Sequence, residues 1–287
     1  MRMRNEVIDL YAYFHVERKN AEGGRLTTYV REPLTEIKPK LRPAMLVLPG
    51  GGYWFCSERE AEPVALRFLT AGYSAFVLDY TVRTAYPVPL IEACMAVSYL
   101  RENAEIYGID PHHIAAVGFS AGGHLTGMLA TMYGVSEVTE AYQSACSPRP
   151  DAVIMSYPVV TMQDGLTHEG TRSIISDGGT IPYDTLSLEK RVTSESAPAW
   201  IWHTSEDNCV PVENALLLAG AYRRAQVPFS LHIFEKGWHG LSLCDSEVHN
   251  QTAGDTALTL VGKWVDLALD WLTDRGFTVR VLSREQL

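Results

Sequence analysis

The chain has 287 residues, 46% hydrophobic and 20% charged, so its composition is that of an ordinary globular protein with enough length for a sizeable core. Its net charge of −10 excludes the basic surface that nucleic-acid binding requires and disfavours contact with an anionic membrane. No apolar run approaches the roughly 18 residues of a membrane helix. The first residues lack a small-residue cleavage site, so we expect no signal peptide and a cytoplasmic protein.

Five cysteines are scattered along the chain, without a CxxC pair or a Cys/His cluster of zinc-binding spacing. We therefore expect reduced thiols, mostly packed in the interior, and neither a metal ion nor another cofactor. The sequence leaves the oligomeric state open, and a homodimer is one of the states that it allows.

The N-terminal segment 1–43 is expected to form antiparallel strands at residues 7–14 and 26–31, joined by a turn at Gly23 and Gly24. From about residue 44 to 275, short apolar runs alternate with helical patterns, which predicts a mostly parallel sheet with helices on both faces. The expected strands of this sheet are 44–48, 74–78, 114–118, 152–156, 200–203 and 229–234. The expected helices are 60–69, 90–107, 121–132, 212–224 and 258–272.

Residues 160–197 interrupt this alternation, because they hold many Ser, Thr, Gly and Asp residues and no clear period. A long connection of this kind in a compact domain is usually functional or mobile. We expect it to form a short cap-like insertion over the carboxyl edge of the sheet. The whole chain, 1–287, is then one α/β domain.

The strongest motif is G-x-S-x-G at residues 118–122, with Ser120 at its centre, between a predicted strand and a predicted helix. This is the context of a nucleophile elbow, a sharp turn that lifts the serine hydroxyl above the sheet. The start of the following helix also places backbone N–H groups and a positive dipole end near a developing oxyanion. A chance glycine-rich helix start is the alternative, and the strand and helix around the motif argue against it.

A second glycine run, Pro49-Gly50-Gly51-Gly52, follows the predicted strand 44–48. Glycines here allow backbone amides to approach a substrate carbonyl closely. The run lies upstream of the elbow, where the loop that supplies a further oxyanion N–H is expected. A flexible turn is the plainer alternative, while a phosphate-binding loop is excluded because no Lys-Ser or Lys-Thr follows.

A serine nucleophile needs a base, and the base needs an acid that orients it. On an elbow of this type the acid and then the base follow the serine in the chain. His239 lies in a loop after the last predicted strand, between Gly237 and Gly240, and we predict that it is the base. The acid is expected in the loop after residues 200–203, where Asp207 is favoured over Glu206 because it lies farther into the loop.

Aromatic residues flank both predicted parts of the site: Tyr53 and Trp54 follow the glycines, and Trp238 precedes His239. We expect these rings to bind substrate by forming the wall of a small acyl pocket, although core aromatics are an equal alternative. The insertion, including His168, Tyr183 and Asp184, could contact the alcohol part of the substrate or be an inert surface loop.

These motifs together resemble the bacterial acetyl-esterase and lipase-like branch of the α/β hydrolases, close to the sugar-acetyl and xylan-acetyl esterases and related to the hormone-sensitive-lipase group. The resemblance covers about residues 44–272 and includes PGGGY at 49–53, GFSAGGH at 118–124, SYP at 156–158, WHTSEDNCVPVENAL at 202–216 and GWHGLSL at 237–243. It implies an α/β-hydrolase fold, a small-molecule ester as substrate, and a catalytic triad of Ser120, Asp207 and His239. It also implies that Gly51, Gly52 and Ala121 donate to the oxyanion.

The chain departs from this pattern at Pro49, where many relatives have histidine before the glycines. Proline has no N–H and fixes its backbone angle φ, so the loop is expected to be held differently. This leaves the choice of Gly51 and Gly52 over Gly50 open.

The sequence therefore predicts a serine carboxylic-ester hydrolase that acts on short acyl groups, acetyl above all, with a carbohydrate ester as the natural substrate. Two alternatives remain. One is a serine peptidase of the same fold, which usually carries a large extra domain. The other is a small-molecule-binding protein on a hydrolase scaffold that has lost catalysis, which an intact triad argues against.

Overall fold

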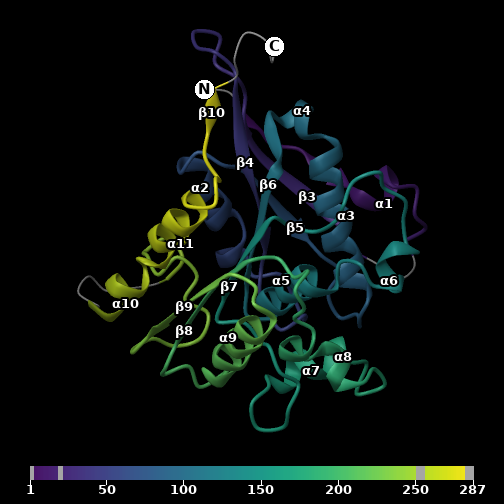
Figure 1. Cartoon of the computed structure of the whole chain (residues 1–287), viewed down its shortest axis with the longest axis vertical. Coiled ribbons are helices and arrows are strands. Elements are labelled where there is room, and N and C mark those ends of the chain that lie inside the picture. The colour runs from purple at the N-terminus through teal and green to yellow at the C-terminus, as the bar shows by residue number, and fades with distance from the viewer. Residues whose placement is uncertain (1–2, 19–21, 250–255, 282–287) are drawn as a thin grey trace.

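The computed structural model describes residues 3–18, 22–249 and 256–281, and its centre is one large twisted sheet (Figure 1). The strands follow the order β1-β3-β5-β4-β6-β7-β8-β9 across the sheet, with β2 paired to β3 and β10 paired to β4. Successive strands in this order are parallel from β5 to β9. The contacts of β3 with β1, β2 and β5, and that of β10 with β4, are antiparallel. The strands are β1 Met3–Arg4, β2 Val7–Asp9, β3 Arg25–Arg31, β4 Lys40–Leu48, β5 Ser74–Asp79, β6 Ile109–Phe119, β7 Ala152–Ser156, β8 Ala199–Thr204, β9 Phe229–Phe234 and β10 Arg280–Val281.

Helices cover both faces of this sheet, and each face has its own apolar core. Side chains of α3, α5 and α9 form the larger core, and those of α2 and α11 form the other. The helices are α1 Leu10–Tyr13, η1 Glu58–Glu60, α2 Glu62–Thr70, α3 Val88–Glu102, α4 Ala104–Tyr107, α5 Ala121–Met132, α6 Ser136–Thr139, α7 Glu169–Ile175, α8 Tyr183–Leu186, η2 Leu188–Lys190, α9 Glu213–Ala225, α10 Thr256–Val261 and α11 Trp264–Thr273. The predicted fold, a mostly parallel sheet with helices on both faces, is confirmed.

The central strands are apolar where helices cover both of their faces. In β7 every side chain is buried, and in β6 all side chains from Ile114 to Phe119 are buried. Such continuous apolar runs are typical of parallel strands between two helix layers. The same property made these strands recognisable in the sequence.

The N-terminal segment differs from its prediction. Residues 7–14 do not form one strand, because β2 ends at Asp9 and the short helix α1 begins at Leu10. The Asp9 side chain accepts a hydrogen bond from the Ala12 backbone N–H at 3.1 Å, and this N-cap starts the helix. The predicted pairing with β3 is therefore confined to Val7–Asp9.

Two predicted helices are each divided in two. The helix expected at residues 90–107 is α3 and α4, separated at Asn103, and the helix expected at 258–272 is α10 and α11. Gly262 lies between the last two helices and is a poor helix former, which accounts for the interruption.

The insertion 160–197 contains short helices, α7, α8 and η2, where the sequence predicted irregular structure. Helices α7 and α8 lie at the same end of the molecule as α9, and α4 and β10 lie at the opposite end (Figure 1). Among the described residues, no helix combines the length and apolar character that crossing a membrane requires.

Candidate active site

Ser120 lies in a strained turn between β6 and α5. Its backbone has φ +52° and ψ −115°, a conformation that non-glycine residues rarely adopt. The turn is so tight that a side-chain Cβ at Gly118 would collide with Thr126 and the Gly122 backbone, and a Cβ at Gly122 would collide with the carbonyls of Leu48 and Pro49. Both glycines of the motif are therefore required by space, as a nucleophile elbow demands.

The structure brings Ser120, His239 and Asp207 together from three separate loops. Ser120 Oγ lies 2.8 Å from His239 Nε2, and His239 Nδ1 lies 2.7 Å from Asp207 Oδ2. Asp207 follows β8 and His239 follows β9, so all three residues stand at the carboxyl ends of parallel strands. With an ionised Asp207, His239 Nδ1–H donates to the carboxylate, and Nε2 accepts from the serine hydroxyl.

Asp207 is held as a carboxylate by several donors. Its Oδ1 accepts hydrogen bonds from the backbone N–H groups of Cys209 and Val210, both at 2.9 Å, and its side chain has no exposed surface. Burial alone raises the pKa of Asp207. The hydrogen bond and positive charge of His239 and the two backbone donors outweigh this and lower the pKa below its ordinary value.

The two candidate acids occupy different places. Glu206 is exposed, and its Oε2 accepts from the Gly237 N–H at 3.2 Å, away from the ring nitrogens of His239. Asp207 is the carboxylate within hydrogen-bonding distance of His239. The geometry thus favours Asp207 as the acid, as its position in the loop sequence did.

The glycine loop after β4 is fixed at its first residues. Pro49 has a carbonyl that accepts from the buried Tyr80 hydroxyl at 2.6 Å, and Gly50 N–H donates to the Glu60 carboxylate at 2.8 Å. The Gly50 N–H therefore already donates to a protein group and is not free to bind an oxyanion. Over the described residues, the amides of Gly51, Gly52 and Ala121 donate to no other group, which leaves them able to bind an oxyanion.

The three aromatic residues of the predicted acyl pocket differ in exposure. Tyr53 is 0% exposed, packs edge-on against Tyr80, and its hydroxyl lies 3.0 Å from His124 Nδ1. A ring without exposed surface cannot contact substrate, so the expectation for Tyr53 is wrong and its side chain belongs to the core. Trp54 is 53% exposed and Trp238 is 49% exposed, so both rings remain accessible next to the loops that hold the site.

The insertion places His168 beside the glycine loop. Its ring atom Cε1 is 3.5 Å from where a Cβ would lie on Gly52. His168 Nδ1 accepts from the Thr171 backbone N–H at 3.2 Å, which leaves the hydrogen on Nε2. Burial lowers the pKa of His168, and the positive charge of His239 lowers it further, so the ring is a neutral donor.

Two residues at the site were not singled out from the sequence as functional. Tyr157 packs its ring edge-on against the His239 ring, with centroids 5.1 Å apart, and its hydroxyl donates to Glu60 at 2.7 Å. Tyr157 lies in the SYP segment that carried part of the resemblance, which was the available signal. No signal in the sequence indicates a role for Glu60, because a glutamate at the start of a helix is usually solvent-exposed.

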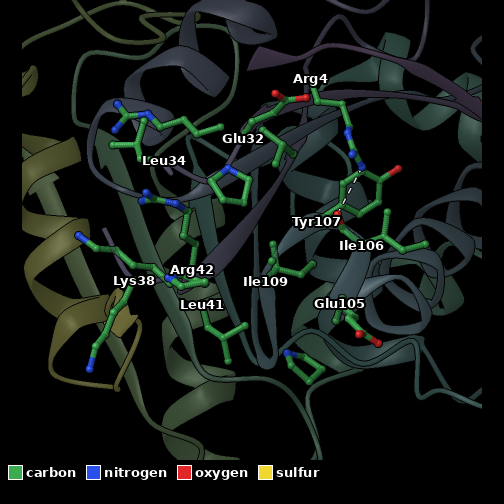
Figure 2. Close-up of a pocket in the computed structure, with 18 of the residues that line it drawn as sticks. Arg4, Glu32, Leu34, Lys38, Leu41, Arg42, Glu105, Ile106, Tyr107 and Ile109 are labelled. Carbon is green, nitrogen blue, oxygen red and sulfur yellow. Dashed lines mark hydrogen bonds between the residues drawn. The ribbon is translucent and has the colours of Figure 1, made fainter. Parts of the chain in front are cut away.

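A cavity of about 780 Å³ lies at the other end of the parallel strands, away from Ser120. Figure 2 shows Leu41, Ile106, Tyr107 and Ile109 around it. Arg4 at its edge donates to the Ile106 carbonyl at 3.3 Å. Charged side chains, among them Glu32, Lys38 and Arg42, also line this space. Its described lining contains no serine, cysteine or histidine, so its size does not make it the catalytic centre.

The sheet, the elbow and the serine–histidine–aspartate contacts define a class of protein, the α/β hydrolases. A solved structure of this class, an acetyl ester-xyloside bifunctional hydrolase from Caldicellulosiruptor lactoaceticus, superposes with a TM-score of 0.78. It is 34% identical in sequence, and the match covers 96% of this chain and 97% of that one. The predicted α/β-hydrolase fold is confirmed.

The family model described as BD-FAE matches residues 34–222, and the chain belongs to this family. The chain is 38% identical over 219 residues to endo-1,4-beta-xylanase B of Butyrivibrio fibrisolvens, a match that covers 74% of this chain and 34% of that protein. It is 28% identical over 236 residues to an acetylxylan esterase of Xylanibacter ruminicola, with 77% and 45% covered. The chain thus spans less than half the length of these two relatives. Together the comparisons support an esterase and confirm the predicted resemblance.

Proposed function

We propose that this chain is a serine carboxylic-ester hydrolase that transfers short acyl groups, acetyl above all, from carbohydrate alcohols to water. The observation that carries the proposal is the continuous hydrogen-bonded chain from Ser120 through His239 to Asp207, beside three uncommitted backbone amides. A serine within reach of an oriented imidazole is the arrangement that activates a hydroxyl for acyl transfer.

In the first half of the reaction, His239 Nε2 takes the proton of the Ser120 hydroxyl while Oγ attacks the ester carbonyl carbon. The carbonyl oxygen becomes negative, and the amides of Gly51, Gly52 and Ala121 stabilise it by donating hydrogen bonds. The carbon–oxygen bond to the alcohol then breaks, and the alcohol leaves with the proton from His239. Asp207 holds the imidazole in orientation and stabilises its charged form.

The second half repeats the same steps with water. His239 takes a proton from a water molecule, whose oxygen attacks the acyl carbon bound to Ser120. The tetrahedral intermediate breaks its bond to Oγ, and the serine recovers its proton from His239. The products are a carboxylic acid and the free enzyme, so the cycle uses only groups of this chain and water.

Bulky rings beside the glycine loop and the base support a preference for short acyl groups. Trp54 and Phe55, which is 58% exposed, follow Gly52, and Trp238 precedes His239. Rings of this size close to the oxyanion amides leave room for a small acyl group more readily than for a long chain.

The alcohol side of the proposal depends on the insertion. His168 offers an Nε2–H donor near Gly52, and its hydrogen-bonded partner in the described residues is Thr171, on the other ring nitrogen. A neutral donor on a polar insertion suits a hydroxyl-rich alcohol. The printed names of the relatives, which include an acetylxylan esterase and an acetyl ester-xyloside hydrolase, point in the same direction.

A direct test compares acetate release from an acetylated xylo-oligosaccharide with hydrolysis of 4-nitrophenyl acetate by the same purified protein. We expect both substrates to be cleaved, and Ser120→Ala to cleave neither. In His168→Leu, kcat/KM for the sugar ester should fall about 3- to 10-fold, the value of one neutral hydrogen bond, while the aryl ester changes less than about twofold.

Asp177→Asn, at an exposed position of the same insertion, is the matched control and should leave both rates unchanged. An untouched sugar ester beside rapid aryl-acetate cleavage would contradict the carbohydrate assignment and leave a general carboxylesterase. Equal losses on both esters in His168→Leu would contradict a role for His168 toward the alcohol.

A further inference from the structure

Glu60 is a buried acidic residue at the end of η1, between the glycine loop and α2. It is 3% exposed, whereas its neighbours Glu58 and Arg59 are exposed. Burying a carboxylate costs free energy unless hydrogen-bond donors replace the water that it loses. The donors to Glu60 come from two different parts of the site.

Each oxygen of Glu60 contacts a different part of the site. Oε2 accepts from the Gly50 N–H at 2.8 Å, and Oε1 accepts from the Tyr157 hydroxyl at 2.7 Å. The Tyr157 oxygen in turn accepts from the Ser242 N–H at 2.8 Å, in the loop that carries His239. The Ser242 hydroxyl donates back to the Arg59 carbonyl at 2.6 Å.

These contacts join the two loops that must act together. Gly50 directly precedes the two amides proposed to bind the oxyanion, and the Tyr157 ring lies against the His239 ring. We propose that Glu60 is a positioning residue whose buried carboxylate holds the oxyanion loop and the His239 loop in one fixed arrangement. This inference rests on the proposed acyl-transfer function.

Two physical consequences follow. Because the Gly50 N–H is fixed, the next two amides are set in direction, and a misplacement of about 1 Å at such a site costs on the order of 10²-fold in rate. The negative charge of Glu60 also lies near His239 and favours the protonated imidazole that forms during the reaction.

The charge state of Glu60 reflects opposing influences. The pKa of Glu60 is raised above its ordinary value because burial outweighs the donors from Tyr157 and Gly50 and the positive charges of His239 and Arg59, which act in the other direction. Tyr80 also interacts electrostatically with this carboxylate. The two hydrogen bonds that Glu60 accepts are the contacts that stabilise a carboxylate in its ionised form.

The test compares Glu60→Gln with wild type, using 4-nitrophenyl acetate. A glutamine of the same shape has one acceptor oxygen and no negative charge, so it cannot accept from both Gly50 and Tyr157. We expect kcat to fall about 10- to 100-fold, KM to change less than about threefold, and the rising limb of the kcat/KM–pH profile to move to lower pH. Glu58→Gln, exposed in the same helical turn, should behave as wild type.

Tyr157→Phe keeps the ring against His239 and removes the hydroxyl, so it covers the case in which Glu60→Gln does not fold. It should lower kcat by about 10-fold, and the double variant should lose less than the product of the single effects because the two groups act through one contact. The proposal is overturned if Glu60→Gln has the kcat and pH profile of the wild type. If Glu60→Gln does not fold, the same result for Tyr157→Phe overturns it. Activity retained by Ser120→Ala would instead overturn the proposed function.

Discussion

The loops that carry Ser120, Asp207 and His239 and the insertion 160–197 meet at the same end of the sheet, but they are built differently. The loops follow buried strands, and their polar groups are joined by hydrogen bonds of 2.7 and 2.8 Å between residues far apart in the sequence. The insertion consists of short helices and many exposed polar side chains. We infer that the loops determine the reaction, and that the insertion determines which alcohol is accepted. The two regions should therefore respond differently to substitution.

The largest effect is expected at Ser120, in the first region. Ser120→Ala should keep the fold and lose on the order of 10⁶ in kcat, the usual cost of removing a triad nucleophile. The measurement is turnover of an aryl acetate by purified protein, with circular dichroism to confirm folding. If more than about a percent of wild-type turnover remained, the reaction would not depend on this serine.

The next effect separates the two neighbouring acids. Asp207→Asn should lower kcat by about 10⁴, because the amide no longer holds the imidazole in the correct tautomer. Glu206→Gln should change kcat by less than about threefold, since its exposed carboxylate accepts from the Gly237 backbone and not from the base. Steady-state kinetics of both variants provide the comparison, and the reverse ranking would transfer the role of the acid to Glu206.

A smaller effect is expected from the length of the acyl group. One methylene is worth about 1–3 kcal/mol in a hydrophobic pocket, so the decline from acetyl to octanoyl esters should amount to at least about 100-fold in kcat/KM. Trp54→Ala should reduce this difference by opening the pocket, while the acetate rate stays within a few-fold. Octanoyl esters hydrolysed as fast as acetyl esters by the wild type would contradict a small pocket.

The smallest effect concerns the contact between the two regions. His124, on the elbow helix α5, is fully buried; it accepts from Tyr53 and donates to the Leu186 carbonyl of the insertion at 2.8 Å. Burial lowers the pKa of His124 from about 6.5 to about 4. Between these two pH values the unfolded chain binds a proton that the native protein does not, so the free energy of unfolding decreases as the pH falls.

Urea unfolding at pH 7 and pH 5 measures this contribution. The wild type should lose about 2 kcal/mol more between these two values than His124→Gln does, because the variant has no group at this position that titrates. Equal losses in the two proteins would show that His124 does not carry this pH dependence.

The parts of this molecule that were predictable from the sequence are those with local signals. The elbow at residues 118–122 combines a strand, two obligatory glycines and a helix start within a few positions, and β7 and β9 appear at the residues expected for them. The parallel sheet followed because buried strands are apolar throughout. The family resemblance added the order of the remaining motifs.

The parts that were missed depend on contacts between residues distant in sequence. From its sequence context Glu60 is expected at the surface, but in the folded protein it is buried and accepts hydrogen bonds from Gly50 and Tyr157. Tyr53 is expected to line the pocket because it follows the glycines, but its ring packs against Tyr80 and His124 and is buried in the core. The tertiary structure determines where a side chain points after a glycine run, so the local sequence pattern does not predict it.

Covalent labelling measures directly whether Ser120 is an activated nucleophile. The protein is treated with a fluorophosphonate probe, and the modified peptide is identified by mass spectrometry. We expect one label, on Ser120, which forms much more slowly in His239→Ala and not at all in Ser120→Ala. A hydrolytically active protein that takes no label, or that is labelled at another serine, would contradict this expectation.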